Sequence, residues 1–174
     1  MGHPLRIGEL AATDRDRITQ ILDATRVFRS EEVNVALELF DDVFAPNAPR
    51  AGDYVFLGAF TPEDELVGYA CYGPTPDPDR TFDLYWIAVD PGAQGTGGGT
   101  GLLTEVERRL EGHNARMLVV ETSSRSEYAP TRRFYETRGY AEAARVREFY
   151  APLDDRIIFT KRFHSPSGRG AVQQ

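Results

Sequence analysis

One stretch of the chain runs from an apolar strand directly into a glycine-rich turn and then into an amphipathic helix. Residues 84–89 are all apolar or aromatic, which is typical of a strand covered on both faces. Five of the eight residues 94–101 are glycine, so backbone N–H groups there can approach a ligand without interference from Cβ atoms. The positive N-terminal end of the following helix points into this loop. Together these features predict an anion-binding site, and the order suits a pyrophosphate.

The spacing of the glycines separates three kinds of phosphate-binding loop. A P-loop requires Gly-x-x-x-x-Gly-Lys-Ser/Thr, but Gly98 and Gly99 stand where its Lys and Ser/Thr belong. A dinucleotide-binding loop requires Gly-x-Gly-x-x-Gly. Two glycine pairs, 95/97 and 97/99, fit its first two glycines, but Thr100 or Leu102 then stands where the third glycine belongs. A third pattern, Gln-x-x-Gly-x-Gly, does fit, and its first residue is Gln94.

This third pattern resembles the acetyl-CoA-binding motif of the GNAT superfamily of N-acetyltransferases. The likeness extends to the Ile-Ala-Val-Asp-Pro before the loop and the Leu-Leu after it. Residues 128–140 are similar to a later GNAT motif, in which a short helix carries Phe-Tyr and ends in Gly-Tyr. The chain departs from that motif at Tyr128 and Thr131, where the family often has Asn and Ala, and this leaves the usual Asn contact with the pantetheine arm open.

The resemblance covers residues 5–163 and implies one acyl-CoA N-acyltransferase domain of the α/β (α+β) class. The implied domain has a GNAT-like central sheet that is mixed and mostly antiparallel, with a parallel, splayed central strand pair and flanking helices. Periodicity predicts the order β-α-α-β-β-β-α-β-α-β-β, with Asp14 or Thr13 and then Ser30 capping the first two helices. A helical crossover makes the strands at residues 82–89 and 117–122 parallel. The tail at residues 164–174 is expected to be disordered.

Composition excludes several classes of function. A net charge of −7 and a pI near 5.0 oppose nucleic-acid binding. Cys71 is the only cysteine, which excludes an intrachain disulfide and indicates a reducing, cytoplasmic location. The three histidines are scattered, so no metal site is expected. The sequence has neither a signal peptide nor an apolar run long enough for a bilayer, so no membrane partner is expected.

The resemblance assigns the residues that hold acetyl-CoA, the expected co-substrate. The pantetheine arm is expected along the main chain of Ile87, Ala88 and Val89, and Gln94 is a further contact. Backbone amides of the loop are expected to grip the pyrophosphate, namely those of Gly95, Thr96, Gly97, Gly98, Gly99 and Thr100. Arginines cluster in the later helix at positions 132, 133 and 138, and Arg132 is predicted to meet a cofactor phosphate. The alternative for this cluster is a solvated helix face.

Acetyl transfer to an amine also needs a general acid for the leaving thiolate and a base for the amine. Tyr135 matches the tyrosine that many family members place near the cofactor sulfur as general acid, and the alternative is a half-buried packing residue. Glu121 follows the buried strand at residues 117–120 and is the candidate base, with Asp83 and Tyr85 as competitors. Cys71 as an acyl-carrying nucleophile is the weaker alternative, because buried cysteines usually serve packing.

The GNAT resemblance implies that the first two helices and the loop between the last two strands recognise the acceptor. The substrate-binding candidates in those segments are Phe28, Glu32 and Tyr150, and Tyr85 is a further candidate. Such aromatic and acidic residues suit a cationic primary amine with an apolar body. The predicted function is acetyl-CoA-dependent N-acetylation of a small-molecule or peptide amine by direct attack in a ternary complex. A non-catalytic acyl-CoA sensor and a nucleotide-binding dehydrogenase are the alternatives. The acceptor's identity, the acyl-chain preference and the oligomeric state, a homodimer included, stay open.

Overall fold

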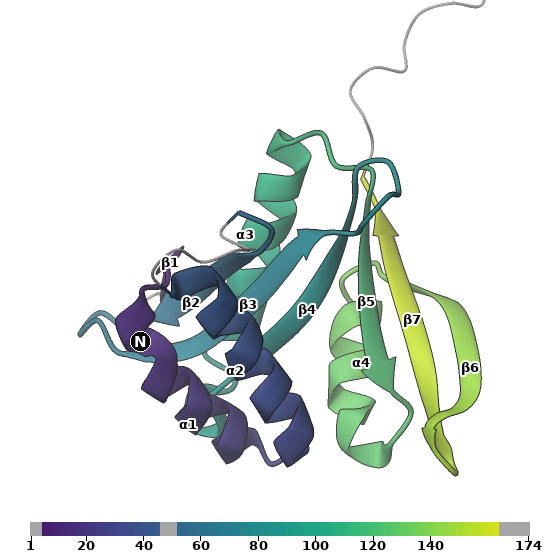
Figure 1. Ribbon diagram of the computed structural model, residues 1–174, viewed down its shortest axis with the longest axis horizontal. Helices are drawn as coiled ribbons and strands as arrows, with labels where there is room; N and C mark the ends of the chain where they lie inside the picture. The colour runs from purple at the N-terminus through teal and green to yellow at the C-terminus, as the bar shows by residue number, and fades with distance from the viewer. Residues whose placement is uncertain (1–4, 46–51, 164–174) are drawn as a thin grey trace, which may run out of the picture.

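A computed structural model describes residues 5–45 and 52–163, in which seven strands form one sheet in the order β1-β2-β3-β4-β5-β7-β6 (Figure 1). The strands are β1 (Arg6–Glu9), β2 (Val55–Phe60), β3 (Leu66–Pro74), β4 (Thr81–Val89), β5 (Met117–Ser123), β6 (Ala141–Ala151) and β7 (Asp154–Arg162). The longer helices are α1 (Arg15–Thr25), α2 (Ser30–Phe44), α3 (Gly98–Gly112) and α4 (Ala129–Glu136). The predicted disordered tail at 164–174 and most of the loop expected at 46–52 lie outside the described residues.

The predicted order of elements and the mixed, mostly antiparallel sheet are confirmed. The predicted cap of α1 is right in position only, and the prediction that Ser30 caps α2 is wrong. Asp14 is the N-cap residue of α1, but its side chain makes no capping hydrogen bond; its carboxylate instead accepts the backbone N–H of Ala11, 2.7 Å away. Helix α2 begins at Ser30 rather than after it, and the carboxylate of Glu32 accepts the backbone N–H of Arg29 at 2.7 Å. In both places the acidic side chain reaches back along the chain, as the third residue of a capping box does.

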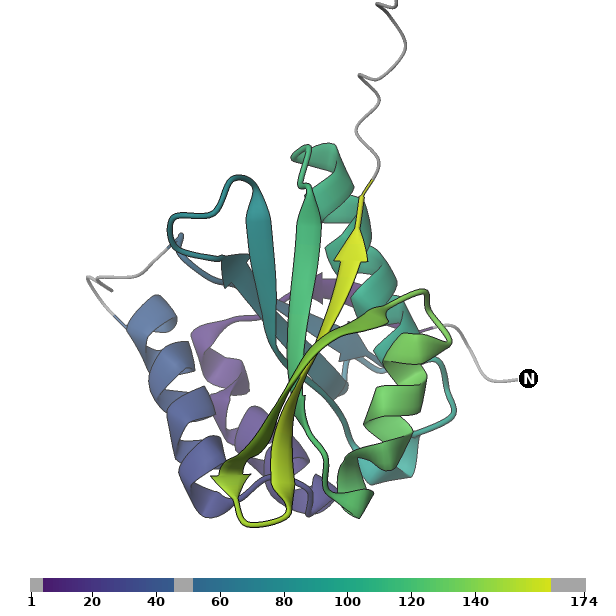
Figure 2. The same ribbon diagram turned by 90° about the vertical axis from the view of Figure 1, so that its right-hand side faces the viewer.

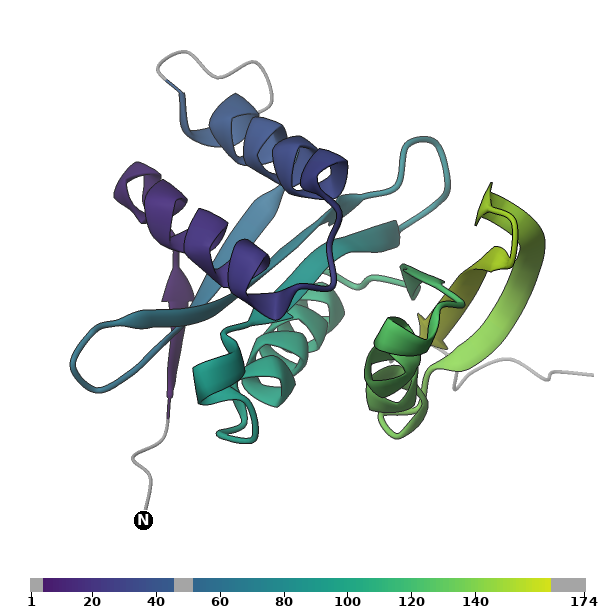
Figure 3. The same ribbon diagram turned by 90° about the horizontal axis from the view of Figure 1, so that it is seen from below.

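Helices cover both faces of the sheet (Figure 3). Helices α1 and α2 pack on one face through Ile18, Ile21, Leu22 and Phe40, and the opposite face is covered by α3 and α4. Cys71 is buried in the core between the sheet and the helices α1 and α2, and this burial raises the pKa of its thiol. The thiol therefore stays protonated and serves packing. Within the described residues, no helix is both long and apolar enough to cross a bilayer.

The parallel pair β4–β5 separates halfway along its length. Its ladder runs from Thr81 opposite Met117 to Leu84 opposite Val120, and both strands continue beyond that point without pairing with each other. On its other side β4 pairs with β3, but the register shifts so that Tyr85 has no partner there. A bulge of this kind bends a strand and re-aims its side chains. The bend and the end of the ladder open the sheet between β4 and β5.

The β6–β7 hairpin closes the far side of this opening (Figure 2). Its tip reaches the connection between α1 and α2, where Arg29 Nη2 lies 2.9 Å from Asp154 Oδ2. Three segments distant in sequence therefore surround the splayed strands: the α1–α2 connection, the β5–α4 connection and the β6–β7 hairpin.

Candidate active site

Three adjoining pockets follow the splayed strands across the molecule. The glycine-loop pocket lies at the start of α3, the central pocket lies between β4 and β5, and the outer pocket lies between the α1–α2 connection and the β6–β7 hairpin. The central pocket shares Val89 and Gln94 with the glycine-loop pocket. It shares Tyr85 and Glu121, among others, with the outer pocket. The three pockets therefore form one continuous cleft.

The glycine-loop pocket brings most of the predicted phosphate contacts together. Gly97, with a φ of 91°, is the N-cap of α3 and offers no side-chain cap, so the first amides of the helix are left for a ligand. Gly95 also adopts a positive φ, of 80°, and a Cβ at either glycine would meet no atom within 4 Å. Thr96 is placed differently: its hydroxyl donates to Ala93 O at 2.6 Å and the residue does not line the pocket.

An ion pair holds the entrance to this loop in place. Asp90 directly follows β4, and its carboxylate accepts the backbone N–H of Gly92 and an Arg17 N–H, each at 2.8 Å. Arg17 also donates to Leu66 O at 2.8 Å, which ties the loop to α1 and β3. The sequence signal for this anchor was the Asp-Pro pair after the strand; its partner on α1 gave no signal.

Arg138, rather than Arg132, reaches the glycine loop. Its guanidinium stacks over the Phe134 ring at 3.7 Å, donates to Thr100 Oγ1 at 2.5 Å and lines the pocket. Arg132 instead donates to the carbonyls of Ser123 and Arg125, at 2.7 and 2.9 Å, at the other end of α4. The predicted phosphate contact of Arg132 therefore has no support in the geometry.

Main-chain and side-chain candidates meet in the central pocket. Ile87, Ala88, Val89 and Gln94 line it from β4 and the loop, and Tyr135 lines it from α4. Tyr135 is 2% exposed, and burial raises the pKa of its phenol, so the group keeps its proton at neutral pH. The departures from the family motif, Tyr128 and Thr131, line this pocket as well.

Glu121 lines the boundary between the central and outer pockets. Its carboxylate forms an ion pair with Arg156 on β7. The side chain is 41% exposed, so water reaches it from the outer pocket. Next to it Thr122 is 5% exposed, and its buried hydroxyl has no hydrogen-bond partner within the described residues.

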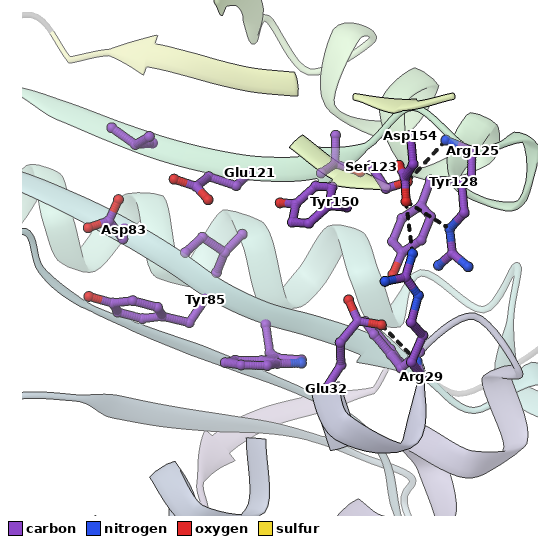
Figure 4. A pocket seen from close by; sticks show the side chains of 15 residues that line it. Arg29, Glu32, Asp83, Tyr85, Glu121, Ser123, Arg125, Tyr128, Tyr150 and Asp154 are labelled. Carbon is purple, nitrogen blue, oxygen red and sulfur yellow. Dashed lines mark hydrogen bonds and ion pairs between the residues drawn. The ribbon is translucent and has the colours of Figure 1, made fainter. Parts of the chain in front are cut away.

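All four predicted substrate residues, Phe28, Glu32, Tyr85 and Tyr150, line the outer pocket (Figure 4). Burial, and next the charge of Asp83, raises the pKa of Tyr85 to about 12. Its phenol is therefore protonated at neutral pH, which opposes the alternative that Tyr85 is the base. The Asp83 carboxylate accepts the Thr75 hydroxyl at 2.6 Å and lines the pocket beside Tyr85.

A buried carboxylate that the sequence did not single out closes one end of the outer pocket. Asp154 is 3% exposed, accepts the hydroxyl of Ser123 and pairs with Arg29 at 2.9 Å. Arg125 approaches the same carboxylate to 3.7 Å and donates to Val27 O at 3.2 Å. This network joins the three segments that surround the pocket and fixes its width.

Comparison with known proteins agrees with this geometry. A family model described as the acetyltransferase (GNAT) family matches residues 17–140. A structure from Desulfovibrio desulfuricans, described as a GNAT-family acetyltransferase, is 39% identical, with a TM-score of 0.82 over 91% of this chain and 98% of that one. No curated protein matches the chain.

Two more distant structures share the fold. The ribosomal-protein-S18-alanine N-acetyltransferase from Escherichia coli is 22% identical, with a TM-score of 0.75 over 97% of this chain and 99% of that one. The PaiA N-acetyltransferase from Thermoplasma acidophilum, in complex with coenzyme A, is 16% identical, with a TM-score of 0.69 over 92% of this chain and all of that one.

Proposed function

Because the chain belongs to the GNAT family of acetyltransferases, we propose that it transfers the acetyl group of acetyl-CoA to a primary amine by direct attack in a ternary complex. The proposed acyltransferase domain spans residues 5–163. One observation carries the proposal: a continuous cleft links the start of α3, the buried Tyr135 and the acidic, aromatic outer pocket. Cofactor and acceptor therefore have separate entrances that meet between β4 and β5.

The residues of the cofactor half fit a coenzyme A. Open space lies where Cβ atoms would project at Gly95 and Gly97, and the uncapped start of α3 suits a pyrophosphate. Arg138 adds a positive charge beside these amides. Beyond Leu84 the edge of β4 that faces β5 has no ladder partner, so its main chain is available to the amides of a pantetheine arm. The distant relative from Thermoplasma acidophilum was solved with coenzyme A.

Acetyl-CoA, when bound, supplies the acetyl thioester. For the proposed chemistry, Tyr135 donates its phenolic proton to the departing thiolate sulfur, because the phenol is protonated and lines the central pocket. Glu121 accepts the proton that the attacking nitrogen loses, directly or through water, because it lies where the central and outer pockets meet.

The outer pocket is proposed to bind a cationic small-molecule or peptide amine. Phe28, Tyr85 and Tyr150 offer apolar and π surface, and Glu32 offers negative charge. The lone Cys71 suits a reducing compartment, so we place the reaction in the cytoplasm. A homodimer is compatible with this arrangement.

A thiol-release assay with acetyl-CoA and a library of primary amines tests the proposal. We expect amine-dependent release of free coenzyme A, with the acetylated amine detected by mass spectrometry. Calorimetry with coenzyme A in parallel separates an enzyme from the alternative, an acyl-CoA sensor. Tight coenzyme A binding without turnover of any amine would contradict the enzymatic proposal.

A further inference from the structure

The charge of the outer pocket is unbalanced. Its lining contains two guanidinium groups, from Arg29 and Arg125, against four carboxylates, from Glu32, Asp83, Glu121 and Asp154. Both arginines face Asp154, and Arg156 from outside the lining pairs with Glu121. Three guanidinium groups therefore face four carboxylates, an excess of one negative charge, and Glu32 and Asp83 are the two carboxylates that form no ion pair within the described residues.

These two carboxylates lie outside the central pocket. Glu121 lines both the outer and the central pocket, whereas Glu32 and Asp83 line the outer pocket alone. Figure 4 shows them at opposite ends of that pocket, Asp83 beside Tyr85 and Glu32 beside Arg29. An ammonium group held by either carboxylate therefore lies outside the central pocket.

The surface between the carboxylates is aromatic. Phe28, Tyr85, Trp86 and Tyr150 line the pocket, and aromatic faces attract ammonium groups as well as alkyl chains. A monoamine reacts in its neutral form near Glu121 and would leave both outer carboxylates without a partner. A molecule with a second ammonium group at the end of an alkyl chain can pair with an outer carboxylate while its chain contacts the aromatic walls.

An independent observation points to a ligand at the reacting end. The Thr122 hydroxyl is buried without a hydrogen-bond partner within the described residues, and Thr122 lines both the central and the outer pocket. Unpaired buried polar atoms are uncommon in folded proteins. A hydroxyl at this position can accept a hydrogen bond from an amine N–H.

We propose that the acceptor is a linear diamine or polyamine. One amine is acetylated between Glu121 and the central pocket, while a second, protonated amine is held by one of the two outer carboxylates, Glu32 or Asp83. This inference rests on the proposed acetyltransferase function and narrows its substrate class.

The test compares kcat/KM for cadaverine, hexylamine and aminopentanol in the thiol-release assay. The three chains have equal numbers of heavy atoms, and only cadaverine carries a second charge. We expect kcat/KM for cadaverine, corrected for its two equivalent amines, to exceed the other two values by about tenfold or more, the equivalent of one net ion pair. The excess should shrink as salt is added.

Glu32→Gln and Asp83→Asn assign the effect to one of the two carboxylates. Either amide oxygen can still accept the hydrogen bond that the carboxylate receives, from the Arg29 backbone N–H or the Thr75 hydroxyl, so the fold is preserved. We expect one of the two variants to lower the ratio of cadaverine to hexylamine kcat/KM several-fold, and this variant identifies the carboxylate that holds the second amine. Glu31→Gln, the same charge change at an exposed neighbour outside the pocket, should leave the ratio unchanged.

Two results would overturn the inference and leave the proposed function standing: equal kcat/KM for diamine and monoamines, or a cadaverine preference that neither variant reduces. A stronger preference for the α-amine of an uncharged peptide would also overturn it. Absence of thiol release with every amine would instead contradict the proposed function itself.

Discussion

Glu121 on β5 and Arg156 on β7 form a diagonal cross-strand ion pair at the boundary between the central and outer pockets. This guanidinium holds the Glu121 carboxylate in position between the two pockets. If Glu121 is the base, Arg156→Gln should lower kcat/KM for the amine several-fold, because the carboxylate is no longer held in place. The measurement is kcat/KM for the amine against pH, with Arg162→Gln at the exposed end of β7 as control.

Glu121→Gln is the companion variant, and it should remove the acid limb of the kcat/KM profile altogether, because that limb reports the base that must be deprotonated. An unchanged acid limb in Glu121→Gln would exclude Glu121 and turn attention to Asp83 or to an amine that arrives neutral.

Tyr135→Phe should lower kcat by about 10²-fold while leaving acetyl-CoA affinity close to wild type, because it removes the proton donor and keeps the ring. Ring contacts with Phe134, Tyr140 and Phe159 persist in the variant, so the melting temperature should change little. Because burial raises the pKa of Tyr135, the wild-type enzyme should show no basic limb from this residue at or below its ordinary value of 10.

Tyr140→Phe provides the matched control for this substitution. The Tyr140 hydroxyl donates to Glu107 at 2.8 Å and does not line the cleft. This variant should lose about 1 kcal/mol of stability and retain kcat. A fully active Tyr135→Phe would show that the general acid lies elsewhere.

Gly99→Val should weaken acetyl-CoA binding by about tenfold or more with little effect on folding. Gly99 lies in the first turn of α3 without a positive φ, and its Cβ would meet Phe134 at an ordinary 3.5 Å, inside the pocket wall. Gly97 is a poorer test, because its φ of 91° strains any side chain whatever the cofactor does. Gly112→Val, at the open end of the same helix, is the control, and calorimetry with coenzyme A is the measurement. Equal affinities in both variants would mean that the loop is only a tight turn.

Glu105 links stability to pH through α3. Hydrogen bonds from Arg108 and then Arg109 lower the pKa of its carboxyl from 4.5 to about 2. A pKa depressed in the folded state contributes stability above the unfolded value, and that contribution is lost as the pH falls from 4.5 towards 2. Glu105→Gln should therefore cost about 1 kcal/mol at neutral pH and progressively less below about pH 4.5, as measured by urea unfolding. Glu111→Gln, at an exposed position of the same helix, is the control, and its stability relative to wild type should not change with pH in this way. A loss of stability in Glu105→Gln that does not depend on pH would contradict the role assigned to Glu105.

Local patterns predicted the parts of the site that local chemistry determines. The glycine loop could be predicted because a positive φ at Gly97 and an uncapped helix start need only adjacent residues. Glu121 could be placed because it follows a short apolar run on a parallel strand. The order of the elements followed from periodicity, whereas the meeting of Phe28 and Tyr150 in the outer pocket was implied by the GNAT resemblance.

Features that depend on how elements pack against each other could not be predicted. The bulge at Tyr85 arises from the register of β4 against β3, and a sequence pattern does not specify that register. In the sequence Asp154 has no feature that separates it from an ordinary surface acid, and its burial depends on the packing of the α1–α2 connection against the β6–β7 hairpin. Arg132 and Arg138 belong to one basic cluster, from which the sequence-based prediction chose Arg132, and only the docking of α4 against α3 shows that Arg138 reaches the loop.

Arg138 and Arg132 should therefore differ in their effect on the cofactor. Arg138→Gln should weaken coenzyme A by about tenfold, because it removes a charge beside the first turn of α3. The loss should be equal for dephospho-coenzyme A if the guanidinium faces the pyrophosphate, which both ligands carry. Arg132→Gln should leave both affinities unchanged and lower the melting temperature instead, since it removes hydrogen bonds to the carbonyls of Ser123 and Arg125. Calorimetry with the two ligands measures the affinities, and a thermal melt measures the stability. A larger loss of affinity for coenzyme A than for its dephospho form in Arg138→Gln would place the guanidinium at the 3′-phosphate. A loss of affinity in Arg132→Gln would instead support the sequence-based prediction that Arg132 meets a cofactor phosphate.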